Sequence, residues 1–189
     1  MLEEIEKYAE IQNIPIMEKE GINFLTNYIK QENIKNILEI GSAIGYSAIK
    51  MALVNENIKV TTIERDENRY QIAIKNINDF NLNNRITIIN KDAFDVNLSE
   101  KYDLIFIDAA KSQSTKFFLK FKDNLNSNGV IITDNIYFHG LTYKENIESR
   151  NLRQMTRKIR EYVDFLKQNQ EFSTEILNIG DGIAISKRK

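Results

Sequence analysis

The sequence predicts a doubly wound α/β sandwich, in which helices cover both faces of a mostly parallel sheet. Three observations lead to this fold class. Short apolar runs alternate with helical segments between residues 36 and 168. Four of the expected strands end at a glycine or an acidic residue, so polar residues gather at one edge of the sheet. Near the end of the chain, Gly180-Asp181-Gly182 separates two further strands and indicates an antiparallel hairpin.

The expected elements follow one another along the chain. Helical spacing of apolar residues predicts two helices, over residues 2–11 and 17–31, with the single proline, Pro15, between them. Beyond them, short apolar runs predict strands, and the amphipathic stretches that separate most of these runs predict helices. The strands are expected at 36–40, 58–63, 86–89, 103–107, 130–133, 172–178 and 182–187, and the helices at 46–54, 67–80, 113–125 and 147–168.

The composition indicates one globular domain over residues 1–189. The net charge of −1 gives no global attraction to nucleic acid or to an anionic membrane. The absence of cysteine excludes disulfides and cysteine–zinc sites. No apolar run approaches the ~18 residues that a bilayer-spanning helix needs, and the acidic start does not resemble a signal peptide. We therefore expect a cytoplasmic protein without a membrane partner.

A glycine-containing segment, Glu39-Ile-Gly-Ser-Ala-Ile-Gly45, follows the first strand and opens the next helix. Gly41 permits a tight turn, and Gly45 lets a ligand approach the start of the helix. Glu64 ends the second strand, where a carboxylate can accept hydrogen bonds from both ribose hydroxyls. Asp92-Ala93 follows the third strand, where an adenine edge would lie. Together these positions predict a site for an adenosine-containing cofactor.

Two other interpretations of this segment stay open. The glycines could serve only the turn from strand to helix, and the acidic residue after the second strand also suits a nicotinamide dinucleotide. The spacing is Gly-x-x-x-Gly, however, without the Gly-x-Gly-x-x-Gly that lets the backbone approach a pyrophosphate. Glu39 also suits a cationic ligand better than an anionic one. Both points favour S-adenosylmethionine, which carries a sulfonium and an ammonium and no phosphate, and they place Glu39 among the candidate cofactor-binding residues.

Oxygen donors gather at the ends of the fourth and fifth strands. Asp108 ends one strand and Asp134-Asn135 the other, and neighbouring parallel strands would bring these side chains to one edge. Carboxylate and amide oxygens suit a hard cation such as Mg²⁺, which would hold an acceptor oxygen and favour its deprotonated form. Lys111, three residues after Asp108, would suit a general base there. Taken singly, Asp108 could instead cap a helix, and Asp134 could be a turn residue.

Three segments resemble the metal-dependent O-methyltransferases of the catechol and caffeoyl-CoA type. They are Glu39–Ser47, Phe106–Lys111 and Ile132–Asn135, and the resemblance extends from about Ile14 to the C-terminus. It implies a Rossmann-like class I methyltransferase fold with a seven-stranded sheet and an antiparallel C-terminal hairpin. It also implies S-adenosylmethionine as the methyl donor, N-terminal helices within residues 1–35 that cover the cofactor, and a homodimer.

The resemblance assigns roles to individual residues. The residues implied to bind Mg²⁺ are Asp108, Asp134 and Asn135, and Lys111 is implied to act as the base, with Asp108 beside it at the catalytic centre. The residues implied to line the cofactor pocket are Met17, Gly41, Ser47, Glu64, Asp92, Ala93 and Asp108.

Within that family, the chain looks most like the bacterial tRNA 5-hydroxyuridine methyltransferases. The segments that carry this finer resemblance are Ile14–Lys19, Gly129–Asn135 and Gly180–Lys187. It implies methylation of the 5-hydroxyl of uridine at the wobble position, which gives 5-methoxyuridine, and the tRNA anticodon stem-loop as the partner. The alternative is a small catechol-like or CoA-linked acceptor at the same cofactor and metal site. A non-catalytic cofactor-binding or RNA-binding module is a third hypothesis, against which the intact set of metal and base residues argues.

A row of arginines supports an RNA partner independently of the resemblance. Arg150, Arg153, Arg157 and Arg160 recur at helical spacing and form what we term the arginine stripe. The apolar residues expected on the opposite face are Leu152, Met155, Ile159, Val163 and Leu166. The guanidinium fork suits phosphates, although a solvated helix face would show the same spacing.

The loop over residues 136–146 is expected to shape the acceptor site. Tyr137, Phe138 and Tyr143 could stack on a splayed base, with lid or core packing as the simpler interpretation. The single histidine, His139, is expected to be an ordinary loop residue, with acceptor contact as the alternative.

Overall fold

The computed structural model describes residues 1–138, 140–142, 144, 147 and 149–189. Its strands are β1 (Asn36–Ile40), β2 (Lys59–Glu64), β3 (Ile86–Asn90), β4 (Tyr102–Ile107), β5 (Leu125–Thr133), β6 (Phe172–Leu177) and β7 (Ile183–Arg188). They form one seven-stranded sheet in the order β3-β2-β1-β4-β5-β7-β6. Only β7 runs antiparallel to its neighbours, β5 and β6, among the paired strands of the described residues. The predicted fold class is confirmed.

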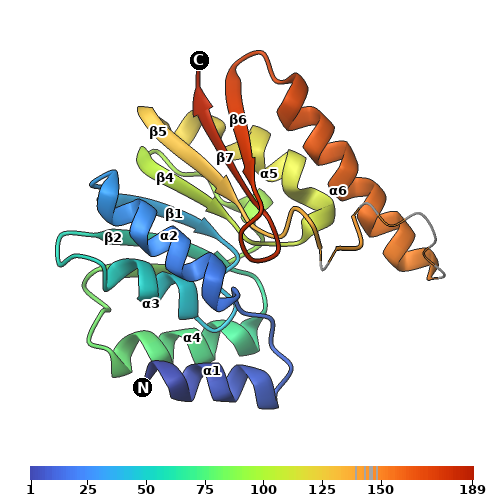
Figure 1. Cartoon of the computed structure of the whole chain (residues 1–189). Helices are drawn as coiled ribbons and strands as arrows, with labels where there is room; N and C mark the ends of the chain where they lie inside the picture. The colour runs from blue at the N-terminus through green and yellow to red at the C-terminus, as the bar shows by residue number, and fades with distance from the viewer. Residues whose placement is uncertain (139, 143, 145–146, 148) are drawn as a thin grey trace.

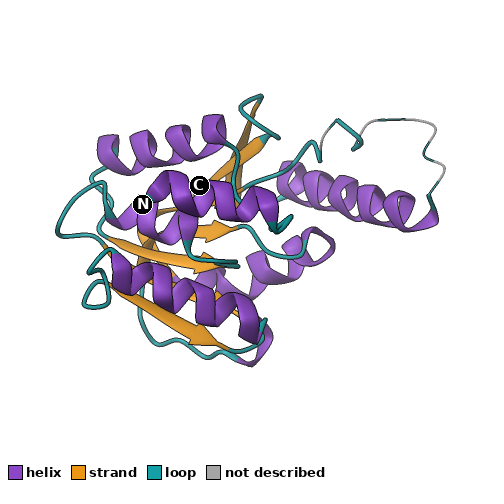
Figure 2. Ribbon diagram, turned by 90° about the horizontal axis from the view of Figure 1, so that it is seen from below, coloured by secondary structure: helices purple, strands orange, loops and turns teal. Residues whose placement is uncertain are grey.

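Helices cover both faces of the sheet, as Figures 1 and 2 show. The helices are α1 (Leu2–Ile11), α2 (Lys19–Gln31), α3 (Tyr46–Ala52), α4 (Glu67–Asp79), α5 (Ser114–Phe121) and α6 (Arg150–Gln168), and the short 3₁₀ turns are η1 (Ala93–Asp95), η2 (Lys111–Gln113) and η3 (Lys122–Asn124). The first four helices pack on one face and α5 and α6 on the other. Alternating strand residues supply both faces, with Leu104 and Phe106 on the first and Ile105 and Ile107 on the second.

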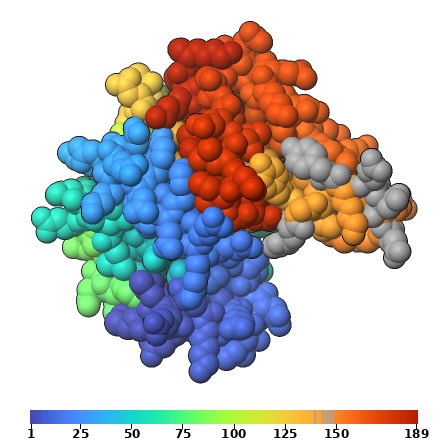
Figure 3. All heavy atoms as spheres, viewed as in Figure 1, coloured from blue at the N-terminus to red at the C-terminus, as the bar shows by residue number. Residues whose placement is uncertain are grey.

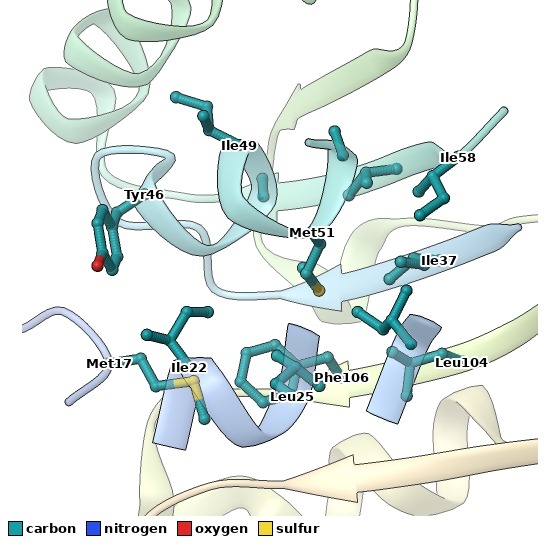
Figure 4. Close-up of a cluster of buried hydrophobic side chains, with 14 of the residues drawn as sticks. Met17, Ile22, Leu25, Ile37, Tyr46, Ile49, Met51, Ile58, Leu104 and Phe106 are labelled. Carbon is teal, nitrogen blue, oxygen red and sulfur yellow. The ribbon is translucent and has the colours of Figure 1, made fainter. Parts of the chain in front are cut away.

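The amphipathic pattern of α2 attaches the N-terminal segment to the sheet. Ile22, Leu25 and Ile29 lie on one side of this helix and are almost fully buried. Figure 4 shows Leu25 beside Phe106 of β4, and Ile22 and Leu104 belong to the same buried cluster. Burying each such side chain contributes roughly 1.5–3 kcal/mol, so this contact holds the N-terminal segment in place beside the sheet.

The structure differs from the predicted boundaries around residue 125. The helix expected over 113–125 is divided into η2, α5 and η3, and β5 begins at Leu125 instead of Val130. The reason is an irregularity in the pairing of β4 with β5. Tyr102 pairs with Leu125 and Leu104 pairs with Val130, so the polar residues 126–129 are accommodated as a bulge within one strand.

Helix α6 is the element that extends furthest from the sheet. Its N-terminal half projects beyond the body of the molecule at the right of Figures 1 and 3. Ser149 caps this end, because its hydroxyl accepts a hydrogen bond from the Leu152 amide at 3.4 Å. Across the described residues, no helix combines the length and the apolar character needed to cross a membrane.

Candidate active site

A cavity of about 650 Å³ lies at the carboxyl ends of the central strands, where β1 and β4 are neighbours. Strand order reverses at this point of the sheet, so the connections leave in opposite directions and a crevice remains. The predicted site residues that line the cavity are Met17, Gly41, Ser47, Glu64, Asp92, Ala93, Asp108, Lys111, Asp134 and Asn135. The volume lies within the usual range for a small-molecule site.

Gly41 is required where β1 meets the end of β4. Its φ angle is +96°, and a Cβ atom placed on it would lie 2.6 Å from the backbone oxygen of Asp108. An L-amino acid would therefore be strained and would clash at the same time. The close approach keeps the glycine segment against Asp108, and this contact joins the cofactor half of the cavity to the acidic half.

Glu64 fixes the loop that follows Gly41. Its Oε2 accepts a hydrogen bond from the Ala43 amide at 2.9 Å, and its Oε1 accepts one from the Asp66 amide at 2.8 Å. The carboxylate is 7% exposed and lines the cavity. Each oxygen can accept a second hydrogen bond, so the carboxylate can still receive two hydroxyl donors from a ligand.

Glu39 is the predicted cofactor residue whose position differs from the expectation. Its side chain is fully buried and does not line the cavity. Ser47 donates a hydrogen bond to Oε1 and Thr62 donates one to Oε2, both at 2.5 Å. Burial, together with the nearby charges of Asp108 and Glu64, raises the pKa of Glu39 to about 7. Glu39 therefore lies behind the cavity wall and reaches the cavity through Ser47, because strand alternation directs its side chain into the core.

Asp92 follows β3, which β2 and β1 separate from β4 and β5, so it lines the side of the cavity away from Asp108 and Asp134. Its Oδ1 accepts a hydrogen bond from the Phe94 amide at 2.9 Å and so caps η1. Its Oδ2 lies 3.4 Å from Nη1 of Arg65, which also lines the cavity. Sequence reasoning did not single out Arg65, although it directly follows Glu64 in the chain.

Asp108, Asp134, Asn135 and Lys111 meet at the other end of the cavity. Backbone pairing places the first two, because the Asp108 amide donates to Ile40 and the Asp134 amide donates to Ile107. Nζ of Lys111 lies 2.6 Å from Oδ1 of Asp108. Asn135 adopts a φ angle of +62°, a left-handed conformation that asparagine tolerates better than most residues. The structure thus brings these four side chains to one edge, as the strand ends predict.

The acidic end of the cavity carries excess negative charge. Burial, followed by repulsion from Asp108, raises the pKa of Asp134 to about 7, with Asp181 adding to the rise and Lys111 opposing it. Within the described residues, no group of three histidine, cysteine, aspartate or glutamate side chains is placed to hold a metal ion. The predicted magnesium site would thus depend on the amide oxygen of Asn135 as its third protein ligand, and it remains a proposal.

Comparison with known proteins assigns the chain that forms this cavity to a family. The O-methyltransferase family matches residues 1–189, the whole chain. This protein belongs to the O-methyltransferase family. A caffeoyl-CoA O-methyltransferase of Populus kitakamiensis is 28% identical over 193 residues, which cover 96% of this chain and 81% of the relative.

Two solved structures extend the similarity to the fold. A provisionally assigned caffeoyl-CoA O-methyltransferase from Staphylococcus aureus has a TM-score of 0.95 and 40% identity, and the match covers 100% of this chain and 92% of that chain. The O-methyltransferase from Bacillus cereus in complex with SAH has a TM-score of 0.85 and 27% identity, and the match covers 100% and 90%.

The methyltransferase cavity contains one acidic residue that sequence reasoning treated only as part of a turn. Asp181, in the loop between β6 and β7, lines the cavity and is 7% exposed. Its Oδ2 accepts a hydrogen bond from Nδ2 of Asn135 at 3.2 Å. The flanking glycines, Gly180 and Gly182, were the available signal, since they indicated a tight turn, but the turn lies beside the site only because β7 pairs with β5.

The segment before α2 closes one side of the methyltransferase cavity. Pro15, Ile16 and Met17 line it, and Met17 is buried. Helix α1 is attached through Glu6, which accepts a hydrogen bond from the Tyr46 hydroxyl at 2.7 Å and pairs with Lys19 at 3.1 Å. Met17 thus lies at the cavity wall, and the covering role of the N-terminal segment over a bound cofactor remains a prediction.

The arginine stripe lies on the exposed side of α6, outside the cavity. Arg153 donates a hydrogen bond to the Ile147 carbonyl at 2.7 Å, and Arg157 lies 3.5 Å from Glu161. The opposite face is buried at Ile159, Val163 and Leu166.

Two residues on that face are not buried like the other three. Leu152 is 36% exposed, because this part of α6 projects beyond the sheet, and Met155 lines the cavity. The buried part of this face is therefore confined to its C-terminal residues, Ile159, Val163 and Leu166.

The loop after Asn135 is described only in part. Phe138 lines the cavity, whereas the Tyr137 ring packs on Gly182 and the core of the second face. His139 and Tyr143, for which we weighed acceptor contacts, lie outside the described residues.

Proposed function

We propose that this methyltransferase transfers the methyl group of S-adenosylmethionine to a hydroxyl of a small catechol-like or CoA-linked acceptor, with a hard divalent cation bound at the acidic end of the cavity. The observation that carries the proposal is that two groups of polar side chains line different parts of one cavity. Glu64 and Asp92 lie toward one end, and Asp108, Asp134, Asn135 and Lys111 meet at the other. The printed names of the Populus and Staphylococcus relatives support an acceptor of the caffeoyl-CoA type.

The cofactor end suits S-adenosylmethionine. Glu64 would receive the ribose hydroxyls, since each of its oxygens has remaining acceptor capacity. Ser47 donates its proton to Glu39, so its oxygen presents only lone pairs to the cavity and can accept from an ammonium group. The Bacillus cereus relative was solved with SAH, which supports the same choice.

The acidic end suits a hard cation. Asp108 and Asp134 would supply carboxylate oxygens and Asn135 an amide oxygen, which is the donor set that Mg²⁺ prefers. Burial and the charge of Asp108 raise the pKa of Asp134, so this pair of carboxylates is a poor arrangement unless a cation or a proton offsets it. When bound, the cation would lower the pKa of an acceptor hydroxyl and hold its oxygen.

The residues of this chain would then position and deprotonate the acceptor. Lys111, as the free amine, would take the hydroxyl proton at Nζ. When bound, S-adenosylmethionine would supply the methyl group. The acceptor oxygen would bond to the methyl carbon as the carbon–sulfur bond breaks, and the sulfur would be left as the neutral thioether of S-adenosylhomocysteine. Gly41 and Asp108 touch across the two ends of the cavity, so the donor and the acceptor would be held in contact.

The second candidate is the methylation of 5-hydroxyuridine at the tRNA wobble position. The exposed arginine stripe favours it, because Met155 of the same helix lines the cavity and the stripe would follow a phosphate backbone that enters there. A free catechol gives a stripe of four arginines no phosphate to bind, whereas tRNA and a CoA-linked acceptor both carry phosphates.

One assay separates the two candidates. The purified protein is incubated with radiolabelled S-adenosylmethionine and Mg²⁺, and with caffeoyl-CoA, a free catechol or tRNA that carries 5-hydroxyuridine. We expect incorporation into a small acceptor, loss of that incorporation with EDTA, and loss with Asp134→Ala but not with the surface control Asp123→Ala. Exclusive incorporation into tRNA would select the second candidate. Full activity in EDTA or in Asp134→Ala would refute the cation.

A further inference from the structure

The loop between β6 and β7 brings Asp181 to a precise place beside Asn135. Nδ2 of Asn135 donates to Oδ2 of Asp181 at 3.2 Å, and the two residues are 46 positions apart in the sequence. An asparagine side chain has its oxygen and its nitrogen on opposite branches, and a half-turn about the last bond exchanges them. Only one of the two orientations offers an oxygen to a cation, so whichever residue engages the nitrogen decides what Asn135 can bind.

The backbone around Asp181 is held on both sides. The Asp181 carbonyl accepts from the Tyr137 amide at 2.8 Å, and the Gly182 carbonyl accepts from the Ile136 amide at 3.0 Å. Gly182 has a φ angle of +85°, and a Cβ atom there would lie 2.6 Å from the Tyr137 ring. The loop is therefore packed directly against the segment that carries Asn135.

A third contact attaches the same loop to the N-terminal segment. The Gly180 amide donates to Oε2 of Glu20 in α2 at 3.1 Å. Asp181 also raises the pKa of Asp134, which is consistent with its carboxylate lying within electrostatic range of the acidic end. A carboxylate placed by three fixed neighbours can orient a side chain that it contacts.

We propose that Asp181 is a positioning residue, which fixes the Asn135 amide so that Oδ1 remains available to the cation. This inference rests on the proposed cation site. Asp181 itself would act through Asn135 and would not need to touch the cation. Partners of this kind typically change metal affinity by about 10–100-fold when they are removed.

Mn²⁺ affinity, measured by electron paramagnetic resonance without acceptor, tests the inference apart from catalysis. Asp181→Ala removes the acceptor of the hydrogen bond, and we expect Mn²⁺ to bind at least about ten-fold more weakly. Asp181→Asn keeps a carbonyl oxygen that can accept from Asn135, and we expect a loss of less than about three-fold. SAH affinity, measured by calorimetry, should remain that of the wild type in both variants. Equal losses in the two variants, or no loss in Asp181→Ala, would overturn the inference.

A role exchange gives a second test that does not depend on the alanine variant folding. Without metal, Asn135→Asp places two carboxylates against each other and should lower the free energy of unfolding. Adding Asp181→Asn restores an amide–carboxylate hydrogen bond with the roles reversed, so the double variant should be more stable than Asn135→Asp alone. Absence of this rescue in urea unfolding without metal would overturn the inference.

A failure of the proposed cation site can be distinguished from a failure of the orienting role of Asp181. If the wild-type protein binds no Mn²⁺, the cation site itself is wrong. The orientation of the Asn135 side-chain amide can still be followed through its resonances in nuclear magnetic resonance spectra. These resonances should move in Asp181→Ala and should stay close to their wild-type positions in Asp181→Asn. Unchanged resonances in Asp181→Ala would overturn the orienting role whether or not a metal binds.

Discussion

Nζ of Lys111 lies 2.6 Å from Oδ1 of Asp108, and both side chains are only 18% exposed. The pair lies at the end of the cavity where we place the acceptor. A lysine in this position has two possible uses, since it can accept a proton as the free amine or supply a fixed positive charge as the ammonium.

Replacement of Lys111 by arginine separates these two uses. Arginine keeps the charge and cannot act as a base, because it is not deprotonated in proteins. We expect Lys111→Arg and Lys111→Ala to lower kcat to a similar extent, by about 100-fold or more, with SAH affinity unchanged. Single-turnover methyl transfer and calorimetry measure the two quantities. An arginine variant that retains most of the wild-type rate would show that the charge alone is needed.

Gly41 provides a prediction about stability and cofactor binding together. Gly41→Ala would place a methyl group 2.6 Å from the Asp108 carbonyl oxygen at a φ angle of +96°. We expect a loss of more than about 2 kcal/mol in the free energy of unfolding and a large loss of SAH affinity.

Gly140→Ala is the matched control for Gly41→Ala. It has a comparable positive φ angle of +72°, and no atom of the described residues lies within 4 Å of the added carbon, so it should cost only about 1 kcal/mol. Urea unfolding measures both variants, and equal losses would contradict the importance of the contact with Asp108.

Glu39 gives the ligand-free protein a defined pH dependence. Its pKa rises from 4.5 to about 7 on folding, so the unfolded chain releases this proton at lower pH than the folded one. The free energy of unfolding should therefore fall as the pH rises from about 4.5 to about 7, by about 3 kcal/mol from this residue.

Glu39→Gln removes this ionisation and should be more stable than the wild type at pH 8 but not at pH 4. The pKa of Asp134 is also raised to about 7, so part of the pH dependence of the free energy of unfolding remains in both the wild type and Glu39→Gln. Urea unfolding at several pH values measures the difference, and a gap between the two proteins that does not change with pH would refute the prediction.

The arginine stripe can be tested without knowledge of the acceptor. Arg153→Glu combined with Arg157→Glu should weaken tRNA binding by about ten-fold or more and flatten its salt dependence, while SAH affinity stays constant. Lys116→Glu combined with Lys167→Glu makes the same charge change at two other exposed positions and serves as the control. Equal effects of the two pairs would mean that tRNA responds only to net charge.

The sequence predicted those parts of the site that depend on strand ends. Asp108 and Asp134 each follow a strand, and parallel pairing of β4 with β5 is sufficient to bring them together. Glu39 was placed less well, because an acidic residue beside a glycine motif suggests a ligand contact, whereas its side chain turns inward to Ser47 and Thr62. The alternation of side chains along β1 decides which way Glu39 points. The sequence does not show which face of the strand meets hydrogen-bond donors, so the direction of a single polar residue in an apolar strand could not be predicted.

The position of Asp181 in the site and the start of β5 could not be predicted, because both depend on how the strands pair. Asp181 enters the site only because β7 pairs antiparallel with β5, a choice that no local pattern records. Residues 126–129 are polar and contain a glycine, so they resemble a loop, yet they belong to a strand that tolerates a shift in register. The predicted homodimer remains a prediction, which light scattering coupled to size-exclusion chromatography would test.

The position of β7 has a consequence for synthesis on the ribosome. This strand lies between β5 and β6 although it is translated after both of them. A nascent chain that has emerged as far as β6 therefore has a gap in its sheet, while β1 to β4 and their helices can already associate. The loop that carries Asp181 also emerges only after β6, so the acidic end of the cavity is the last part of the site to be completed.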